Sequence, residues 1–295
     1  MRQHRLEVTT PDQRTLHFAT FGEASGPTVV FHHGTPGSAS SALMIADAVT
    51  DAGMFIVALS RAGYGESSRR AGRSVGSVVE DTRVALDALG RDRYVAVGWS
   101  GGGPHALACA ALDAPRCQAA WSLAGVAPRD VGFDWTEGMA QENVEEFAAA
   151  VEGGPVHEAS IAAEAEHYAG ADPQNVVELF GGLFSPPDLA ALADHGLRAR
   201  LATATREAFA GGYFGFYDDD RAFFSPWGFD PRDIAVPVQV WYADQDFMVP
   251  ATHGAWLAEN IPTATAVTMP GEGHLSFFVT YADHLAASLS RMAEV

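Results

Sequence analysis

Lysine is absent from this chain of 295 residues, so all 18 of its basic residues are arginines. This absence excludes chemistry that needs a lysine amine, such as Schiff-base formation or a P-loop that binds a nucleotide phosphate. The 37 acidic residues outnumber the arginines and give the chain a net charge of −19. Such a charge repels nucleic acid and anionic membrane surfaces, so we expect neither as a partner.

Cysteine is almost as scarce, since Cys109 and Cys117 are the only two in the chain. Two cysteines without a C-x-x-C pair or a His/Cys cluster provide neither a disulfide framework nor a set of zinc ligands. The neighbours His32 and His33 do not suggest a metal site either, because adjacent residues of a strand point to opposite faces. We therefore expect no metal ion, and we expect both cysteines to pack as small apolar side chains.

Long hydrophobic runs are also missing. No apolar stretch approaches the roughly 18 residues of a membrane-spanning helix, and the first 16 residues lack the apolar region of a signal peptide. With 47% hydrophobic and 19% charged residues, the composition is that of a globular protein that can bury a sizeable core. We expect a cytoplasmic protein, and the sequence leaves its oligomeric state open, homo-oligomers included.

Short apolar runs rich in valine, isoleucine and phenylalanine alternate with helical patterns along the chain. This alternation is typical of an α/β fold, in which helices cover a mainly parallel sheet. The first two runs, 6–10 and 16–21, predict a leading hairpin. The other predicted strands are 28–32, 55–59, 94–98, 118–124, 236–242 and 264–269.

Helices are predicted between these strands, at about 38–52, 75–89 and 104–112. From residue 127 to about residue 232 there is no comparable strand, only helical segments such as 142–151, 157–168 and 189–209. A stretch of this length is too long for a loop inside a compact domain. We therefore interpret residues 129–231 as an inserted helical cap, and residues 1–128 and 232–295 as the core that carries it.

The chemistry of the chain centres on Gly98-Trp99-Ser100-Gly101-Gly102, which fits the pattern G-x-S-x-G. In this pattern Gly98 and Gly102 leave room for a serine on a strained turn between a strand and a helix. Alone, the pattern is equally compatible with a flexible Gly/Ser loop. Its context favours the strained turn, because an apolar run precedes Ser100 and a good helix former follows it.

A nucleophilic serine needs a histidine base and a carboxylate that orients this base. Asp246 is the preferred acid, since it lies farther past the predicted strand than Asp244 and can face a histidine of the next loop. Asp244 is the alternative acid, and its other interpretations are a helix cap or a side chain that faces water. Three histidines follow. His253 and His284 fall in helical stretches, whereas His274 lies in a glycine-rich loop after the last predicted strand and is the preferred base.

The segment 32–38, His-His-Gly-Thr-Pro-Gly-Ser, follows a buried strand and precedes a helix. A turn at this place can aim the backbone N–H of Thr35 at an oxyanion, together with the N–H of Gly101 just after the serine. A simple turn capped by Ser38 is the alternative, and the two interpretations are compatible.

In these segments the sequence resembles the α/β-hydrolase family. The stretches HGTPGS, SRAGYGES at 60–67, GWSGGG, DQDFMVP and GEGH occur in the family's order. The resemblance covers 1–128 and 232–295, and it implies an eight-stranded, mostly parallel sheet flanked by helices, with a helical cap after the sixth strand. Ser60 departs from the aspartate that often opens the second stretch, at a structural position that hardly affects the mechanism.

The resemblance also implies an activity. Family members that open epoxides or displace halide use an aspartate nucleophile, so Ser100 argues against both reactions. The expectation is acyl transfer on a small-molecule ester without a cofactor, through Ser100, His274 and Asp246. Amidohydrolases, proline iminopeptidases, cofactor-free haloperoxidases and carbon–carbon bond hydrolases stay open as alternatives, as does a ligand-binding protein without catalytic activity.

Two sets of cap residues bear on the substrate. In the iminopeptidases that the fold resembles, cap carboxylates bind the free amine of the substrate, but a solvated helix face is the simpler interpretation here. The acidic residues concerned are Glu137, Glu142, Glu145 and Glu146. Apolar cap residues are expected to line an acyl pocket or to pack the cap on the core: Phe133, Trp135, Met139, Phe147, Phe214, Phe216 and Phe223.

Overall fold

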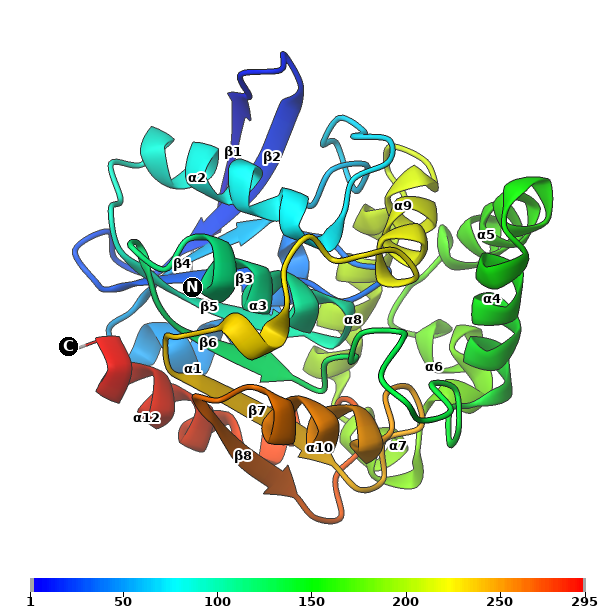
Figure 1. The fold of residues 1–295 in the computed structure, drawn as a ribbon. Coiled ribbons are helices and arrows are strands. Elements are labelled where there is room, and N and C mark those ends of the chain that lie inside the picture. Colours follow the sequence, from blue (N-terminus) through cyan, green and yellow to red (C-terminus); the bar gives the residue numbers. More distant parts are fainter. Residues whose placement is uncertain (1–2, 294–295) are drawn as a thin grey trace.

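The computed structural model describes residues 3–293, and eight strands within this range form one sheet. The strand order is β1-β2-β4-β3-β5-β6-β7-β8 (Figure 1). β1 and β2 form the predicted hairpin, β2 also runs antiparallel to β4, and all remaining pairs are parallel. The strands are β1 His4–Thr9, β2 Thr15–Phe21, β3 Thr28–His32, β4 Phe55–Leu59, β5 Tyr94–Trp99, β6 Cys117–Leu123, β7 Val238–Ala243 and β8 Ala264–Met269.

The central strands owe their place to their sequences. Every residue of β3, β4 and β5 is buried, as expected for continuous apolar runs in a parallel sheet that is covered on both faces. At the sheet edge, β1 is mostly exposed and carries His4, Arg5 and Glu7. Charged side chains on an edge strand discourage pairing with another chain.

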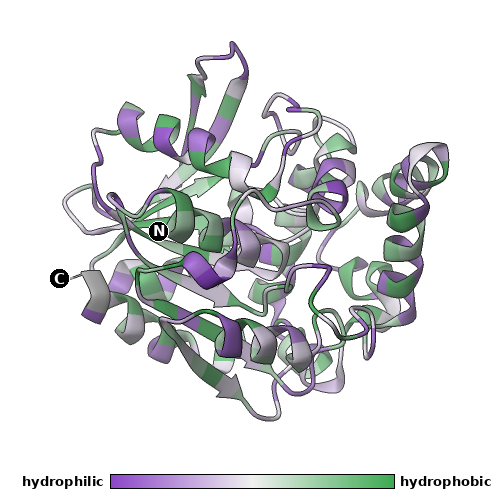
Figure 2. Ribbon diagram, in the orientation of Figure 1, coloured by the Kyte–Doolittle hydropathy of each residue, from purple (hydrophilic) through white to green (hydrophobic). Residues whose placement is uncertain are grey.

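Helices cover both faces of the sheet. The apolar side chains of α1 and α12 pack on one face, and those of α2, α3 and α10 pack on the other. Figure 2 shows hydrophobic residues along the central strands and hydrophilic ones on the outer turns of these helices. These helices, together with the short α11 that precedes α12, are α1 Ala46–Asp51, α2 Val78–Ala88, α3 Gly103–Leu112, α10 Ala251–Asn260, α11 Phe277–Thr280 and α12 Ala282–Ala293.

Six further helices lie in the chain between β6 and β7, on the side toward which the parallel strands point (Figure 1). They belong to the segment 129–231, which we keep as the proposed extent of the cap. They are α4 Gln141–Glu152, α5 Gly154–Tyr168, α6 Val176–Leu179, α7 Pro186–Ala191, α8 His195–Ala208 and α9 Phe214–Phe223. None of the helices described in residues 3–293 is long and apolar enough to cross a membrane.

Two predicted helices were wrong in their continuity. Instead of one helix over 38–52, the chain forms a 3-10 helix, η1 Ala39–Met44, followed by α1. The predicted helix 189–209 is interrupted between Ala191 and His195, where the Asp194 side chain accepts a hydrogen bond from the N–H of Leu197 and starts a new helix. Helical periodicity alone does not reveal such a cap inside an apolar pattern.

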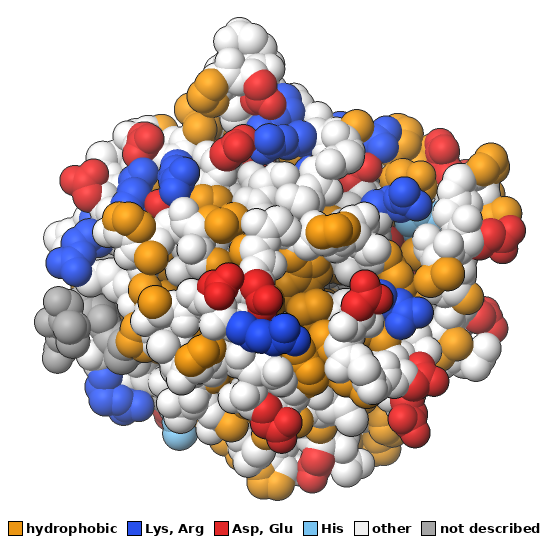
Figure 3. Space-filling view, in the orientation of Figure 1, with side chains coloured by type: hydrophobic (Ala, Val, Ile, Leu, Met, Phe, Trp, Pro, Cys, Tyr) orange, Lys and Arg blue, Asp and Glu red, His pale blue; other side chains and the backbone are white. Residues whose placement is uncertain are grey.

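The surface mixes charges of both signs. On the face seen in Figure 3, acidic and basic side chains lie interspersed, and hydrophobic side chains line a hollow near the middle. The excess negative charge therefore does not form a single acidic region on this face. Cys109 and Cys117 are buried as free thiols, in line with their expected role as small packing residues.

Candidate active site

Ser100 occupies the turn between β5 and α3, within the short 3-10 helix η3 Ser100–Gly102. Its φ angle is +55°, a left-handed conformation that is strained for any residue with a side chain. A Cβ atom on Gly98 would lie 2.0 Å from the carbonyl oxygen of Gly102, and one on Gly102 would lie 2.1 Å from that of His32. The two glycines flanking the serine therefore allow the backbone to close tightly around it.

Asp246 and His274 lie in the loops that follow β7 and β8. The Nδ1 atom of His274 is 2.7 Å from Oδ2 of Asp246, and both side chains are buried. The other carboxylate oxygen of Asp246 accepts hydrogen bonds from the N–H groups of Met248 and Val249, each at 2.8 Å. The carboxylate is thus held from both sides, and it orients the imidazole through Nδ1, which leaves Nε2 for other partners.

Ser100 and His274 line the same cavity, together with Gly34 and Thr35. Ser100 and Thr35 also line a second cavity, which Gly101 and the cap helices α4, α5 and α9 complete. A Cβ atom on Gly101 would lie 2.3 Å from Oγ1 of Thr35, so these two residues stand directly against each other beside the serine. All five residues singled out for catalysis or oxyanion binding, Ser100, Asp246, His274, Thr35 and Gly101, are therefore connected by direct contact or by a shared cavity.

This arrangement can be set beside known proteins. The family model described as alpha/beta hydrolase fold matches residues 27–281. The chain belongs to the alpha/beta hydrolase fold family. A comparison with curated proteins finds no match.

Solved structures similar to this hydrolase cover nearly its whole length. A thermophilic esterase from Thermogutta terrifontis is 18% identical, with 98% of this chain and 99% of the esterase covered and a TM-score of 0.69. A bromoperoxidase from Bacillus anthracis is 20% identical, with 99% and 100% covered and a TM-score of 0.69. Epoxide hydrolase A from Mycobacterium thermoresistibile is 20% identical, with 99% and 98% covered and a TM-score of 0.69. At such low identity these likenesses describe the fold.

The remaining histidines of this hydrolase have other partners. His253 is buried in α10, where Nδ1 accepts a hydrogen bond from the N–H of Ala127 and Nε2 lies 2.9 Å from the carbonyl oxygen of Trp135. Burial lowers its pKa to about 4, so this imidazole is neutral near pH 7. His284 is exposed and lies against the ring of Trp241.

His32 and His33 are both buried and contact different groups. His32 lies 3.5 Å from the Cys109 sulfur, whereas His33 accepts a hydrogen bond from the N–H of Arg61. No group of three or more His, Cys, Asp or Glu side chains that would suit a metal ion occurs in residues 3–293. Asp244, the alternative acid, accepts a hydrogen bond from the N–H of Gly271 at 2.7 Å, so it holds the loop after β8.

The cap contributes an unexpected group of carboxylates, which we call the acidic wall: Glu146 of α4, Glu164 of α5 and Asp220 of α9. Glu146 and Glu164 line the second cavity with Ser100. Asp220 is fully buried and lies 2.9 Å from Nε2 of His157. The simple expectation of a solvated helix face was therefore wrong for Glu146, although Glu137, Glu142 and Glu145 are exposed.

Burial and repulsion by neighbouring carboxylates raise the pKa values of the acidic wall. Burial, followed by the charge of Asp220, raises the pKa of Glu164 to about 7 and that of Glu146 well above its usual range. Burial also raises the pKa of Asp220 to about 6. The wall consequently retains protons near neutral pH and becomes more negative as the pH rises. Sequence spacing placed Glu146 on a helix but had no signal for the approach of Glu164 and Asp220 from two other helices.

Apolar residues complete the second cavity. Phe147, Phe216 and Phe223, three of the apolar cap residues singled out in the sequence, line the second cavity alongside Val126 and Met248 of the core. Trp135 instead packs inside, against the rings of Phe147, Phe224 and His253. The site therefore combines an apolar surface with the acidic wall.

Proposed function

We propose that this protein is a serine hydrolase that cleaves small carboxylic esters through Ser100, His274 and Asp246. The observation that carries the proposal is that Ser100, on its strained turn, shares a cavity with a histidine held by a buried aspartate. An apolar surface beside this cavity suits the acyl chain of an ester. The proposal needs no metal ion and no cofactor.

The mechanism proceeds through an acyl-enzyme. His274 accepts the hydroxyl proton as Oγ of Ser100 forms a bond to the carbonyl carbon, and the N–H groups of Thr35 and Gly101 bind the resulting oxyanion. Collapse of this intermediate breaks the bond to the alcohol, which leaves with the proton from His274. A water molecule then attacks the acyl carbon and gives a proton to His274. His274 passes this proton to Oγ of Ser100 as the bond to the acyl group breaks, which releases the carboxylic acid and free Ser100.

The test combines a covalent probe with ester hydrolysis. A fluorophosphonate is expected to label the wild-type protein, which should also hydrolyse p-nitrophenyl esters, and Ser100→Ala should abolish labelling and reduce turnover at least ~10³-fold. Ser41→Ala is the matched control, because Ser41 lines the same cavity without occupying the turn. A Ser100→Ala variant with near-wild-type turnover would contradict the mechanism, and folded wild-type protein that resists labelling would favour a binding role.

A second candidate function follows from the acidic wall: removal of an amino-terminal residue, as in a proline iminopeptidase. Glu146 and Glu164 border the cavity of Ser100 and would pair with a substrate ammonium group. This candidate predicts that proline p-nitroanilide is a better substrate than p-nitrophenyl acetate.

Variants of the acidic wall separate the two candidates. If the amine is bound there, Glu146→Gln should raise KM for the anilide at least ~10-fold and leave ester hydrolysis within about twofold. Glu145→Gln is the matched control, because Glu145 lies next in sequence on α4 and is exposed. A preference for esters that is unchanged in Glu146→Gln would rule out the peptidase.

A further inference from the structure

A buried carboxylate of the cap holds the loop that carries His274. Asp188 of α7 is fully buried and accepts hydrogen bonds from the backbone N–H groups of three consecutive residues. The distances are 3.1 Å to His274, 2.7 Å to Leu275 and 2.9 Å to Ser276. The same carboxylate accepts a hydrogen bond from the hydroxyl of Ser185 at 2.8 Å. The backbone of the histidine loop is thus tied to the cap rather than to the core alone.

The approach of α7 to this loop is close enough to require a glycine. A Cβ atom on Gly273 would lie 2.2 Å from Oγ of Ser185 and 2.4 Å from Oδ2 of Asp188. No side chain fits in this space unless α7 moves away from the loop. The glycine immediately before His274 therefore serves the contact between the cap and the core.

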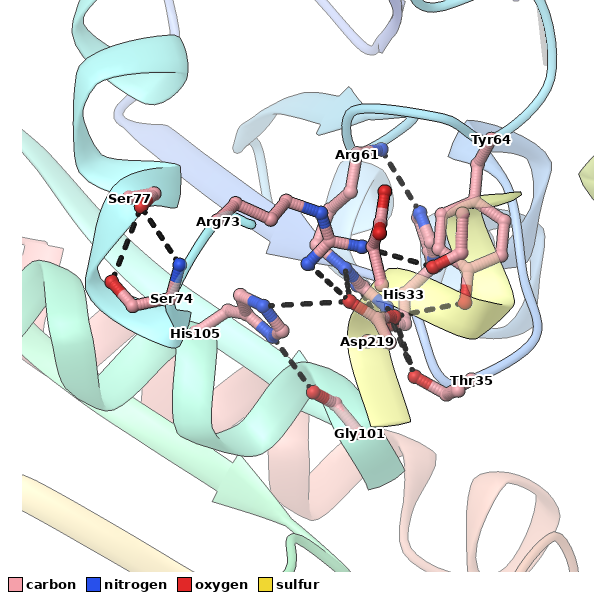
Figure 4. Close-up of polar contacts among 12 residues, drawn as sticks. His33, Thr35, Arg61, Tyr64, Arg73, Ser74, Ser77, Gly101, His105 and Asp219 are labelled. Atoms are coloured by element: carbon pink, nitrogen blue, oxygen red, sulfur yellow. Dashed lines mark hydrogen bonds and ion pairs between the residues drawn. The ribbon is translucent and has the colours of Figure 1, made fainter. Parts of the chain in front are cut away.

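A second buried cap carboxylate holds the loop that contains Thr35. Asp219 of α9 is fully buried and accepts hydrogen bonds from Oγ1 of Thr35 at 2.7 Å and from the hydroxyl of Tyr64 at 2.9 Å. It also pairs with the guanidinium groups of Arg61 and Arg73. Figure 4 shows these side chains converging on Asp219 from separate segments of the core.

Arg61 extends this network to the backbone beside Thr35. Its guanidinium donates hydrogen bonds to the carbonyl oxygens of His33 and Gly34 and to Oγ1 of Thr35. Nδ1 of His105 lies 2.8 Å from the carbonyl oxygen of Gly101, and Nε2 of the same ring lies 3.8 Å from Asp219 (Figure 4). Both backbone segments proposed to bind the oxyanion therefore border this network.

The charge balance of the network makes separation of its parts unfavourable. Burial raises the pKa of Asp219, but the opposing effects of Arg61 and Arg73 dominate and hold it well below its usual range. Burial and the Arg61 charge lower the pKa of His105 well below its usual range, so this imidazole is neutral. Withdrawal of α9 would leave two buried guanidinium groups without their carboxylate, which costs far more than breaking a surface ion pair.

We propose that Asp188 and Asp219 are positioning residues through which the cap holds the two loops of the catalytic site. Asp188 sets the backbone around His274, and Asp219 sets the loop of Thr35. The inference rests on the proposed hydrolase function. It implies that α7 and α9 stay docked on the core during turnover, because their departure would release both loops.

Substitutions at Thr35 test the Asp219 contact and keep the backbone N–H. Thr35→Val removes the hydroxyl that contacts Asp219, whereas Thr35→Ser retains it. We expect kcat for a p-nitrophenyl ester to fall ~10- to 100-fold in Thr35→Val, with KM within about threefold of wild type. Thr35→Ser should keep most of the wild-type kcat. Asp219→Asn is a less specific test, because it also removes the charge with which Arg61 and Arg73 pair.

The Asp188 contact is tested against a matched aspartate. Asp188→Asn is expected to lower kcat ~100-fold, while Asp194→Asn, which removes the hydrogen bond to Leu197 at the start of α8, should stay within about threefold. If Asp188→Asn fails to fold, Ser185→Ala removes one of its hydrogen bonds and should lower kcat more modestly, with KM unchanged. Thr35→Val and Ser185→Ala variants that keep wild-type kcat would overturn the proposal.

Amide hydrogen exchange provides a readout that needs no activity. Exchange should accelerate in peptides covering 272–278 for Asp188→Asn and 32–38 for Thr35→Val, with wild-type rates in the Asp194→Asn control. Unchanged exchange at these loops would refute the positioning role. Wild-type protein that neither hydrolyses esters nor reacts with a fluorophosphonate would contradict the proposed function, and the exchange result would then decide the positioning role separately.

Discussion

Replacing Glu164 by glutamine tests the electrostatics of the acidic wall. Burial and the neighbouring Asp220 charge raise the pKa of Glu164 from an ordinary 4.5 to about 7. Glutamine has nearly the same shape and cannot ionise, so the substitution removes the titration and keeps most of the packing.

The magnitude follows from linkage between protonation and folding. A raised carboxyl pKa means that the native state binds the proton more tightly than the unfolded chain. The resulting stability is complete below pH 4.5 and is lost as the pH rises through about 7. Each pH unit of pKa difference corresponds to about 1.4 kcal/mol, and partial exposure of the side chain reduces the total for Glu164 to about 2 kcal/mol.

Urea unfolding followed by tryptophan fluorescence measures this effect at pH 4.5, 6, 7 and 8. Titrations shared by both proteins cancel in the difference between Glu164→Gln and wild type. We expect the free energy of unfolding of the variant to gain about 2 kcal/mol on wild type between pH 4.5 and pH 8. Glu166→Gln, an exposed position on the same helix α5, should show no such pH dependence. If the difference in free energy of unfolding between Glu164→Gln and wild type stays constant or falls as the pH rises, the raised pKa of Glu164 is refuted.

Three further predictions concern the turn, the acid and the packing of the cap. Gly98→Ala should reduce kcat for an ester at least ~100-fold, because the added Cβ would lie 2.0 Å from the Gly102 carbonyl oxygen. Circular dichroism should show unchanged secondary structure, and a normal kcat would show that the turn adapts to the side chain. Asp246→Asn should lower kcat ~10⁴-fold with little change in KM, since the amide no longer orients the imidazole; loss confined to KM would speak against this role. Trp135→Ala should lower the free energy of unfolding in urea by about 3–5 kcal/mol, because Trp135 is fully buried. Phe247→Ala, at an exposed position, should change it by less than about 0.5 kcal/mol, and equal effects of the two substitutions would contradict the packing argument.

The sheet was predictable because its central strands are buried on both faces. Apolar residues make up all of 55–59 and the middle of 28–32, between Thr28 and His32, and the structure confirms both segments as strands with the predicted bounds. The helix predicted over 189–209 was wrong in its continuity, because Asp194 caps a new helix within a pattern that still appears periodic. Local hydrogen bonds of one side chain decide such ends, and they depend on conformation as well as sequence.

The candidate site was readable from the sequence to the extent that it lies at strand ends. Parallel strands bring their carboxyl ends to one edge of the sheet, so Ser100, Asp246 and His274 could be assigned from the loops in which they occur. The contact between Asp246 and His274, the shared cavity and the strained φ of Ser100 are what the structure adds.

The three consecutive aspartates of α9 show where the sequence stops being sufficient. As a run of acidic residues, 218–220 resembles a solvated helix face, yet all three are buried. Successive residues of a helix point about 100° apart, so each side chain meets a different neighbour. Asp218 pairs with Arg69, Asp219 with Arg61 and Arg73, and Asp220 with His157.

Local patterns of hydrophobicity and turn residues were enough to predict the order of the strands along the chain and the loops that carry the candidate nucleophile, acid and base. The folded chain was needed to show which carboxylates of the cap line the site or hold its loops. Asp188, Asp219 and Glu164 take their surroundings from residues distant in the chain, and the physical effect of a carboxylate depends on its burial and its partners rather than on its neighbours in sequence.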